Sequence, residues 1–420
     1  MGEVIAVGIF LTPASMSKSL GSPLLLLIVW LVMGAVALCG ALCYGELAAR
    51  FPEAGGGYVY LREAYGPRMA FLYGWMLMLV LDPGLTAAFA VGMASYASYI
   101  VGLTPGGIKA LAIATILLLA AANIRGVRLG AGLMQGLTVL KLGLLLFIAL
   151  WGFGSGRGDW SHFTPFWSQR PGSEPLIAAL AGGVVGAFFA FGGWWDVSKI
   201  AGEVRDPART LPRALSLGVL TITLVYIMTS AVFMYLVPVS GVTSGETFAA
   251  QAGEVLFGRA GGRVFSAIVV ISVLGSLAAY IMVAPRVYYA MARDRLFFKA
   301  VAAIHPRFGT PARAIALQAA LAAGLVAVGT FEQIIAYFFF VTVVFIALTV
   351  AALFVLRRRG EHPAPQPSYR TTGYPLTTLV FLTLVTLLLI LLAINNPKQA
   401  FLGVAVVALG VPVYRLIFRH

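Results

Sequence analysis

The fold is decided by the stretch Phe189-Ala190-Phe191-Gly192-Gly193-Trp194 and by a second stretch, Gly8-Ile9-Phe10. Each stretch places glycine inside a strongly apolar segment, where its conformational freedom favours an interruption of the helix. A helix interrupted in hydrocarbon leaves N–H and C=O groups unpaired, at a cost of several kcal/mol each unless protein, water or a ligand binds them. Two such breaks at corresponding places in two halves indicate a binding site near the bilayer midplane, as is typical of transporters.

The chain has the composition of an integral membrane protein. Of its 420 residues, 60% are hydrophobic and 10% are charged, which excludes an ordinary soluble domain. Apolar runs of about 20 residues, enough to cross roughly 30 Å of hydrocarbon, recur along its length. We predict an all-α membrane protein, a single integral domain over residues 1–420 with about twelve transmembrane helices. The predicted spans lie near 1–20, 22–48, 69–100, 107–123, 131–153, 176–201, 213–239, 263–291, 313–329, 333–356, 375–395 and 399–418.

The net charge of +14 sets the orientation of the chain. If the N-terminus is cytoplasmic, most of the 29 lysines and arginines fall in loops on the inside, as the positive-inside rule requires. The basic residues therefore indicate topology and not a nucleic-acid partner. We predict a multi-pass protein of the cytoplasmic membrane, embedded in the lipid bilayer, with both termini in the cytoplasm.

Spans one to five and six to ten are interpreted as two copies of one unit. Because five is odd, the second copy enters the membrane from the opposite side, and the repeat is inverted. Repeat one covers about 1–153 and repeat two about 176–356, and a broken span opens each copy. Two additional helices, 375–418, are predicted to pack outside the repeat.

The predicted spans lack the groups of residues that catalysis or metal binding would need. Cys39 and Cys43 lie four positions apart on one apolar helix, where a disulfide is disfavoured, and are interpreted as buried bystanders. We therefore predict that the protein is not an enzyme and has no cofactor and no metal. The histidines all lie in predicted loops or at the C-terminus: His162, His305, His362 and His420.

The two breaks suit the two ends of an amino acid. The N–H groups and the positive dipole end of the helix that resumes after the break at Gly8, with Pro13 in its first turn, favour a carboxylate. The carbonyls freed around Gly192-Gly193 are suited to accept hydrogen bonds from an ammonium group. Phe191 and Trp194 are either an aromatic lid over this site or ordinary packing residues.

Charged residues inside the predicted spans need a polar or oppositely charged partner, or they have a functional role. By likeness to sodium-coupled relatives, the ammonium group of Lys141 is predicted to stand where their sodium ion sits and to brace spans one, five and eight; a structural lysine bonded to carbonyls and proton coupling are the alternatives. Asp82 is close to mid-depth and either pairs with a lysine, binds a cationic substrate or carries a proton. Asp196 and Lys199, three apart on one helix, are predicted to neutralise each other.

Two glutamates lie at the predicted cytoplasmic ends of helices. Glu46 is close to Arg50 in the sequence, and Glu203 is close to Arg205. They form either an inner gate or an ordinary solvated interface. Residues 51–67, with a triple-glycine hinge, form an amphipathic connector that is either a plain loop or part of such a gate.

Only seven residues precede Gly8, too few for the first half of a broken span. We interpret this as a mis-set or truncated start and not as a natural shortening. The short first span keeps one alternative of another class open, an amino-acid-responsive membrane receptor without transport.

The motifs resemble those of the amino acid–polyamine–organocation superfamily, especially its L-type amino acid transporter branch. The family's first-span motif Gly-Ser-Gly-Ile-Phe is matched by Ala6-Val7-Gly8-Ile9-Phe10, and its sixth-span motif Phe-Ala-Tyr-Gly-Gly-Trp by residues 189–194. Further matches are Glu203, Pro207, Arg209 and Leu211-Pro212-Arg213 after span six, Asn123, Gly126, Gln135, Thr138 and Lys141 in spans four to five, and Gly275-Ser276-Leu277 and residues 286–294 in span eight.

This resemblance implies the leucine-transporter fold, alternating access and an amino acid as substrate. It implies that the substrate is bound at Ala6 to Phe10 and at Phe189 and Phe191 to Trp194, and Lys141 implies sodium independence. Ala6 and Val7 depart from the motif by replacing Gly-Ser, and Trp195 replaces an asparagine. No cysteine follows span three, so no disulfide-linked heavy subunit is expected.

Together these observations predict a secondary active transporter for neutral amino acids, working as an exchanger or as a proton-linked permease. Neutral substrates are favoured because Gly192-Gly193 leave an uncharged pocket for the side chain. If Asp82 faces that pocket, cationic amino acids or polyamines become the better interpretation.

Overall fold

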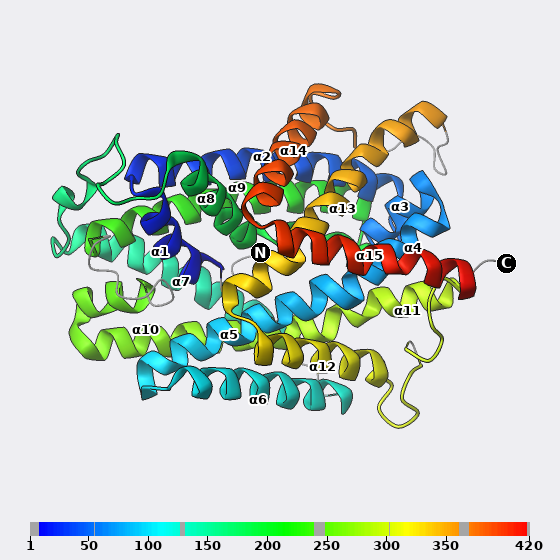
Figure 1. The fold of residues 1–420 in the computed structure, drawn as a ribbon, viewed down its shortest axis with the longest axis horizontal. Helices are drawn as coiled ribbons and strands as arrows, with labels where there is room; N and C mark the ends of the chain where they lie inside the picture. The colour runs from blue at the N-terminus through cyan, green and yellow to red at the C-terminus, as the bar shows by residue number, and fades with distance from the viewer. Residues whose placement is uncertain are drawn as a thin grey trace.

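The computed structural model describes residues 8–53, 55–126, 131–238, 248–301, 303–360 and 369–417, and within these ranges it contains helices and no strand (Figure 1). The helices of the first half are α1 (Gly8–Leu20), α2 (Pro23–Arg50), α3 (Gly57–Tyr65), α4 (Pro67–Met76), the π-helical turn η1 (Leu77–Leu81), α5 (Asp82–Val101), α6 (Pro105–Ile124) and α7 (Ala131–Gly154).

The second half continues the helical pattern after a loop that contains a short 3-10 turn, η2 (Trp160–Phe163). Its helices are α8 (Leu176–Phe191), the 3-10 helix η3 (Trp194–Glu203), α9 (Pro207–Leu236), α10 (Phe248–Val283), α11 (Pro285–Arg293), α12 (Ala312–Val328), α13 (Phe331–Arg359), α14 (Leu376–Asn395) and α15 (Pro397–Ile417).

Ten helical segments in the described part of the chain are long and apolar enough to cross a membrane. They coincide with ten of the twelve predicted spans. The other two predicted spans contain α1, with 13 residues, and α12, with 17 residues. The protein is therefore a multi-pass helical membrane protein, and the count of twelve spans stays a prediction.

Proline and small polar residues mark where many of these helices begin. Pro23, Pro67, Pro105 and Pro207 each occupy the first turn of a helix, where the missing N–H costs no intrahelical bond. The hydroxyl of Ser22 accepts a hydrogen bond from the backbone N–H of Leu25 and caps α2. The sequence therefore sets these boundaries locally.

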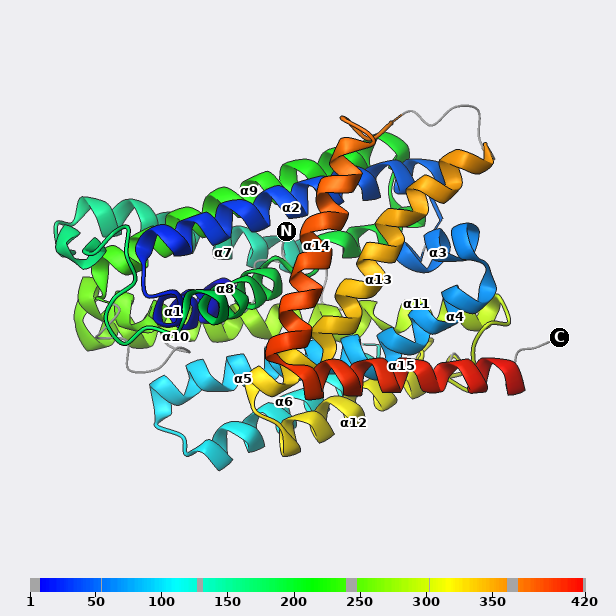
Figure 2. The same cartoon turned by 45° about the horizontal axis from the view of Figure 1, so that its top comes forward.

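Helices that are five spans apart pack against each other. The pairs are α1 with α8, α2 with α9, α5 with α10, and α6 with α12. Figure 2 shows α2 and α9 side by side along one face and α5, α6 and α12 towards the opposite face. This pairing is consistent with a two-fold relation between the halves; the inverted repeat itself stays a prediction.

Small residues allow the paired helices to approach closely. A Cβ atom added to Gly34 of α2 would lie 2.4 Å from the side chain of Thr223 on α9, which is far inside van der Waals contact. Glycine at such positions lets two backbones pack tightly in a membrane, where van der Waals contact stabilises helix pairs.

The third span changes its helical pitch in the middle, at η1. Pro83 has no N–H to donate to the carbonyl of Leu79, four residues earlier. The hydroxyl of Tyr337 from α13 donates to that carbonyl instead, at 3.5 Å. The backbone N–H of Asp82 reaches back five residues to the carbonyl of Leu77, as in a π-helix. The proline thus explains the local change of pitch and fixes where Asp82 lies.

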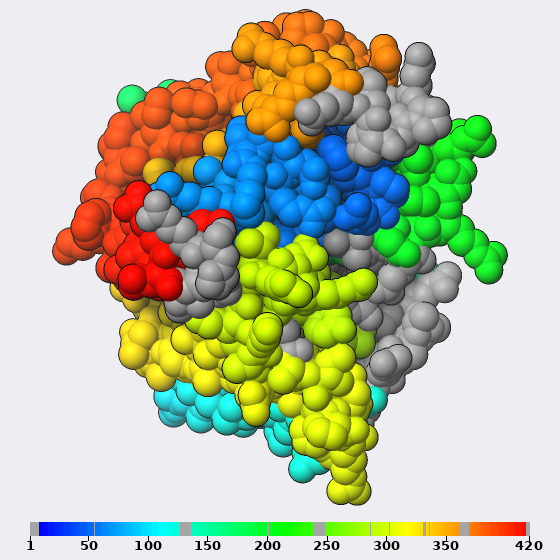
Figure 3. All heavy atoms as spheres, turned by 90° about the vertical axis from the view of Figure 1, so that its right-hand side faces the viewer, coloured from blue at the N-terminus to red at the C-terminus, as the bar shows by residue number. Residues whose placement is uncertain are grey.

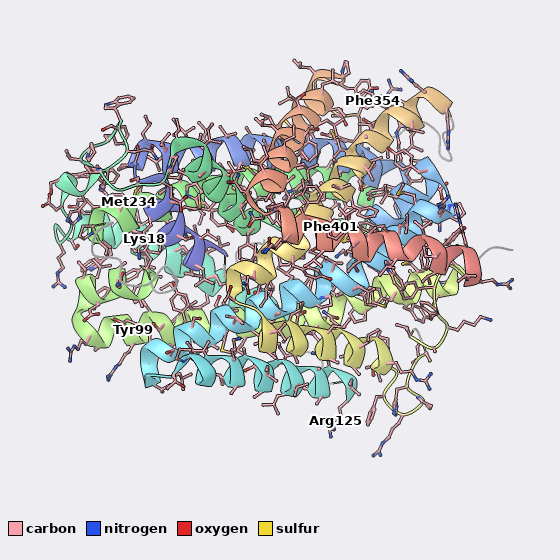
Figure 4. The ribbon with its side chains drawn as sticks, in the orientation of Figure 1. Lys18, Tyr99, Arg125, Met234, Phe354 and Phe401 are labelled. Atoms are coloured by element: carbon pink, nitrogen blue, oxygen red, sulfur yellow. The ribbon has the colours of Figure 1, made fainter. Side chains whose placement is uncertain are left out.

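The molecule has two ends along its long axis. Lys18 and Tyr99 lie near one end, which we call the Lys18 end, and Arg125 lies towards the other (Figure 4). The opposite end, which we call the α3 end, is viewed in Figure 3, with α3 and α4 in the centre beside the segment that follows α11.

Candidate functional site

The sixth span leaves α-helical geometry at Gly192 and Gly193. The helix α8 ends at Phe191, and Gly192 follows with φ −48° and ψ 143°. Gly193 has a φ of 93°, which L side chains rarely adopt, and the 3-10 helix η3 starts at Trp194. Two consecutive glycines therefore turn the chain between two helical segments of different pitch.

This turn adjoins the first described residues of α1. A Cβ atom added to Gly8 would lie 2.6 Å from the Cα atom of Ala190, so nothing larger than glycine fits there without a shift. Ile9 and Phe10 are fully buried. The structure thus brings Gly8 to Phe10 next to the sixth-span motif, whereas Ala6 and Val7 lie outside the described residues.

Two tyrosines hold backbone carbonyls of these two stretches. The hydroxyl of Tyr96 on α5 donates to the carbonyl of Phe10 at 2.6 Å. The hydroxyl of Tyr226 on α9 donates to the carbonyl of Ala190 at 2.7 Å. Both tyrosines are buried, so each bond replaces water and fixes the path of the main chain beside the break.

The carbonyls inside the break differ from one another in their partners. The carbonyl of Gly193 accepts a hydrogen bond from the N–H of Asp196 at 3.0 Å. The carbonyls of Phe191 and Gly192 receive no hydrogen bond from the residues that the structure describes. These two oxygens are therefore the ones with capacity to bind a donor from a ligand.

Two cavities meet the broken sixth span. A large cavity of about 1110 Å³ opens at the Lys18 end, between α1, α8, α13 and α14. It is lined by residues that include Thr12, Ser15, Lys18, Glu174, Phe189 and Ile335. A small cavity of about 20 Å³, room for about one water molecule, lies beside the break. It is lined by Leu81, Leu85, Phe188, Phe189, Gly192, Gly193, Trp195, Asp196, Phe338, Phe339 and Thr342.

Phe189 is the aromatic residue of the motif that lines both cavities. Its ring lies 6.5 Å from that of Phe338 on α13. Phe191 and Trp194, the two predicted lid residues, pack elsewhere. The ring centroid of Phe191 is 5.3 Å from that of Tyr226, and that of Trp194 is 5.1 Å from that of Tyr44. Their contacts in this structure are those of packing residues against α9 and α2.

A comparison with known sequences decides the family. The profile of a family described as amino acid permease matches residues 1–413. The chain belongs to the amino acid permease family. It is accordingly a membrane transporter and not an enzyme.

Relatives of this permease are transporters and exchangers of amino acids. The serine/threonine exchanger SteT of Bacillus subtilis is 30% identical over 99% of this chain and 93% of its own length. The human large neutral amino acids transporter small subunit 2 is 29% identical over 99% of this chain and 78% of its own length. The human b(0,+)-type amino acid transporter 1 is 28% identical over all of this chain and 86% of its own length.

Lys141 of the permease lies in the middle of α7 and is buried. Its ammonium group donates to the hydroxyl of Ser276 on α10. The fifth and eighth spans are thus joined at this lysine, as the sequence predicts. The predicted link to the first span stays a prediction.

Asp82 is fully buried at the start of α5. Its carboxylate accepts a hydrogen bond from the hydroxyl of Tyr280 at 2.7 Å and another from the hydroxyl of Tyr288. It does not line the large or the small cavity described above. Asp196 does line the small cavity, and its Oδ1 lies 2.7 Å from the Nζ of Lys199. This pair forms as the sequence predicts.

Glu46 is fully buried and is held by four donors. Its carboxylate accepts hydrogen bonds from Arg50 at 2.7 Å, from two nitrogens of Arg357 at 3.0 and 2.6 Å, and from the backbone N–H of Thr371 at 2.8 Å. A solvated interface is therefore excluded for Glu46. For Glu203, the other predicted gate residue, the backbone is described and the side chain is not.

Polar contacts also join α3 to neighbouring segments at the α3 end. The hydroxyl of Tyr58 and the Nη1 of Arg62 both donate to Asp294, at 2.7 and 2.8 Å. The N–H of Gly55 donates to the carbonyl of Lys199 at 3.0 Å. These contacts tie the connector after α2 to η3 and to the end of α11, on the side of the break that lies away from the large cavity.

Three features of the site lie outside what sequence reasoning found. Tyr280 and Tyr288 are about 200 residues from Asp82, and Arg357 is about 310 from Glu46. The two tyrosines lie near one face of the eighth span. A buried aspartate in the third span needs hydrogen-bond donors, and this need was the signal in the sequence that could have pointed to them. Phe189 was included with its motif, but its position between two cavities depends on the turn at Gly192-Gly193.

Proposed function

We propose that this permease carries neutral amino acids across the cytoplasmic membrane by alternating access, without sodium. The observation that supports this most is the contact between Gly8 and Ala190, which brings two glycine-bearing stretches together. Main-chain groups at a midplane break are suited to bind a zwitterion, because they supply donors and acceptors without a buried charge. The names of two relatives, a serine/threonine exchanger and a large neutral amino acids transporter subunit, agree with such substrates.

In this proposal the main chain binds both ends of the amino acid. The N–H groups at the beginning of α1, from Gly8 to Phe10, face the substrate carboxylate. The carbonyls of Phe191 and Gly192 accept hydrogen bonds from the substrate ammonium group. Phe189 separates the large cavity from the small one and must move for the two to join.

Access is proposed to alternate between the two ends of the molecule. The large cavity leads from the Lys18 end to Phe189, whereas contacts of Arg62, Glu46 and Gly55 join segments at the α3 end. This is the arrangement of an outward-facing state if the α3 end is cytoplasmic, as the distribution of arginines indicates. Opening of the α3 end requires these contacts to break while the large cavity closes.

Sodium independence rests on Lys141. Its ammonium group supplies a fixed positive charge between α7 and α10, so no metal cation is needed at that place. No disulfide-linked partner is proposed, because the chain's two cysteines, Cys39 and Cys43, both lie within α2.

Neutral side chains are favoured by the lining of the small cavity. Its walls are apolar apart from Thr342 and Asp196, and Asp196 is paired with Lys199. The alternative of a cationic substrate depended on Asp82 facing the pocket, and both of its oxygens bind tyrosine hydroxyls instead.

Uptake by the purified protein in liposomes tests the proposal. Vesicles preloaded with unlabelled leucine or serine are expected to exchange it for the labelled amino acid, with no effect of sodium, and to discriminate against arginine. Arginine preferred over leucine would support the cationic alternative. Binding without any exchange would support the receptor alternative, and either result would overturn the proposal.

One substitution tests the site itself. Gly8→Ala introduces a Cβ atom 2.6 Å from the backbone of Ala190 and is expected to lower exchange at least about tenfold. Gly324→Ala is the matched control, because a Cβ there meets nothing within 4 Å. Equal exchange by the two variants would argue against a binding site at this contact.

A further inference from the structure

A group of exposed basic residues surrounds the segment between α11 and α12, at the α3 end of the molecule. Six arginine and lysine side chains, all of them exposed, form this surface, which we call the basic patch: Arg125, Arg293, Arg295, Lys299, Arg307 and Arg313. The first directly follows α6, and the others lie between the end of α11 and the first turn of α12. Figure 3 shows this segment extending from the centre of the α3 end to the lower edge of that face.

The basic patch has few carboxylates to balance its charge. Within the described part of the chain, none of its six cations forms an ion pair, whereas Arg50, Arg62 and Arg357 at the same end each bind a carboxylate. Asp294 is the one acidic residue in the sequence from 293 to 313, and it already accepts hydrogen bonds from Tyr58 and Arg62. The positive charge of this surface is therefore available to an anionic partner.

The segment between α11 and α12 is joined to the helices around it. Phe297 is buried, and its ring centroid lies 6.1 Å from that of Tyr288 and 6.1 Å from that of Phe71. The hydroxyl of Thr310 donates to the carbonyl of Ile124 at 2.7 Å, which joins the other end of the segment to α6. The cations are therefore gathered beside the ends of α6 and α11 and the start of α12.

Exposed apolar groups accompany these cations. The side chain of Ile304 is 49% exposed. The guanidinium carbon of Arg307 lies 5.5 Å from the ring centroid of Phe308, which is half-buried. Positive charge beside exposed apolar side chains, at the ends of membrane-spanning helices, is the pattern of a surface in the headgroup region of a bilayer. A soluble polyanion would neutralise the cations and leave Ile304 in water, so the pattern favours a lipid.

We propose that the basic patch binds anionic phospholipids, with their phosphate groups on the cations and their first acyl carbons against Ile304. Guanidinium groups suit this role, because their planar fork matches two oxygens of a phosphate. The α3 end is the cytoplasmic end in the proposed function, and the cytoplasmic leaflet carries anionic lipids. The positive-inside rule accounts for cations on this side of the membrane, but not for their gathering beside an exposed apolar side chain.

This inference goes beyond the proposed function, and lipid binding by the purified full-length protein tests it without a transport assay. Native mass spectrometry measures the affinity for phosphatidylglycerol and for phosphatidylcholine with the same acyl chains. Both lipids carry a phosphate, and only phosphatidylglycerol has a net negative charge. We expect the wild-type protein to bind phosphatidylglycerol at least about tenfold more tightly than phosphatidylcholine.

Neutralising three cations of the basic patch should remove this preference. In the triple variant Arg295→Gln, Lys299→Gln, Arg307→Gln, the affinity for phosphatidylglycerol is expected to fall at least about tenfold, with that for phosphatidylcholine unchanged. The matched control removes the same charge from three exposed arginines at the start of α9, one of which lies 3.9 Å from the carboxylate of Asp206: Arg205→Gln, Arg209→Gln and Arg213→Gln. The control should keep the wild-type preference.

A second variant tests the apolar part of the surface and keeps every charge. Ile304→Ser removes the exposed apolar side chain and is expected to lower the affinity for phosphatidylglycerol at least about twofold. Because it changes one exposed residue, it also serves if the triple variant fails to fold. Inorganic phosphate, added at the concentration of the lipid, should not displace phosphatidylglycerol, since it has no acyl chain to contact Ile304.

Each contrary result overturns the lipid site. Equal losses in the triple variant and its control would show that only net charge acts, without a site. Equal affinity of the wild-type protein for the two lipids would mean that the cations do not select an anionic headgroup. Displacement by inorganic phosphate, or an unchanged affinity in Ile304→Ser, would mean that the surface binds phosphate and not a lipid. All four results leave the proposed function intact, because none of them measures transport.

Discussion

Two buried charged groups of this permease contrast in how they are balanced. Glu46, Arg50 and Arg357 form one group, in which a single carboxylate binds two guanidinium groups and a backbone N–H. Asp82, Asp196 and Lys199 form the other, in which two buried carboxylates accompany one ammonium group. The surplus positive charge of the Glu46 group reaches solvent, because the Arg357 side chain is 23% exposed, whereas the Asp82 carboxylate is enclosed and accepts hydrogen bonds from two tyrosine hydroxyls. The four hydrogen bonds on the Glu46 carboxylate, three of them from guanidinium nitrogens, indicate a structural anchor.

The largest effect is expected from removing the charge of the anchor. Glu46→Gln leaves Arg50 and the inner part of Arg357 without a carboxylate and should lower the free energy of unfolding by about 3–5 kcal/mol. Thermal unfolding followed by labelling of buried Cys43 with a thiol-reactive dye measures it. Glu63→Gln, a change at a more exposed position, should stay within about 0.5 kcal/mol of wild type. Similar thermal unfolding of Glu46→Gln and Glu63→Gln would show that the Glu46 group is not a structural anchor.

Removal of the ammonium group sharpens the other side of the comparison. Lys199→Met leaves the buried carboxylate of Asp196 without its paired cation and is expected to lower the free energy of unfolding by about 3–5 kcal/mol. The same thermal assay measures the change. Lys109→Met, at a half-buried lysine whose ammonium group donates to the carbonyl of Ala327, should lower it by no more than about 1–2 kcal/mol.

A smaller effect is expected from changing the geometry of the anchor while keeping its charge. Arg357→Lys replaces a two-point contact with Glu46 by a single one and weakens a cation–π contact, in which the guanidinium lies 3.6 Å from the ring of Tyr374. The expected loss of stability is about 1–2 kcal/mol, measured by the same thermal assay. No loss would mean that charge alone holds the anchor.

The smallest change in stability is expected at Asp82, which tyrosine hydroxyls hold. Asp82→Asn removes the surplus negative charge and keeps an acceptor for the tyrosine hydroxyls, so unfolding should change by less than about 1 kcal/mol. Thermal unfolding of this variant beside Glu46→Gln is the direct comparison. A loss as large as that of Glu46→Gln would show that both groups are structural anchors.

Much of the fold could be predicted from the sequence, because apolar runs and glycines act locally. The ten long spans and the turn at Gly192-Gly193 follow from hydropathy and from the conformations that only glycine adopts readily. The partners of Asp82 and Glu46 could not be predicted, since they come from helices hundreds of residues away in the sequence. The direction of Phe189, Phe191 and Trp194 could not be predicted either. It depends on how far the chain rotates at the two glycines, which the sequence pattern leaves open.

The π-helical turn η1 makes the third span sensitive to its residue count. A π-turn accommodates one residue more than an α-turn, and each residue turns a helix by about 100°. Deleting one residue from Leu77–Leu81 would restore regular pitch and rotate the preceding half of the span against the following one. Either α4 would lose its packing contacts, or Asp82 would rotate away from Tyr280 and Tyr288. The number of residues in this turn therefore determines which side chain the third span places at mid-depth.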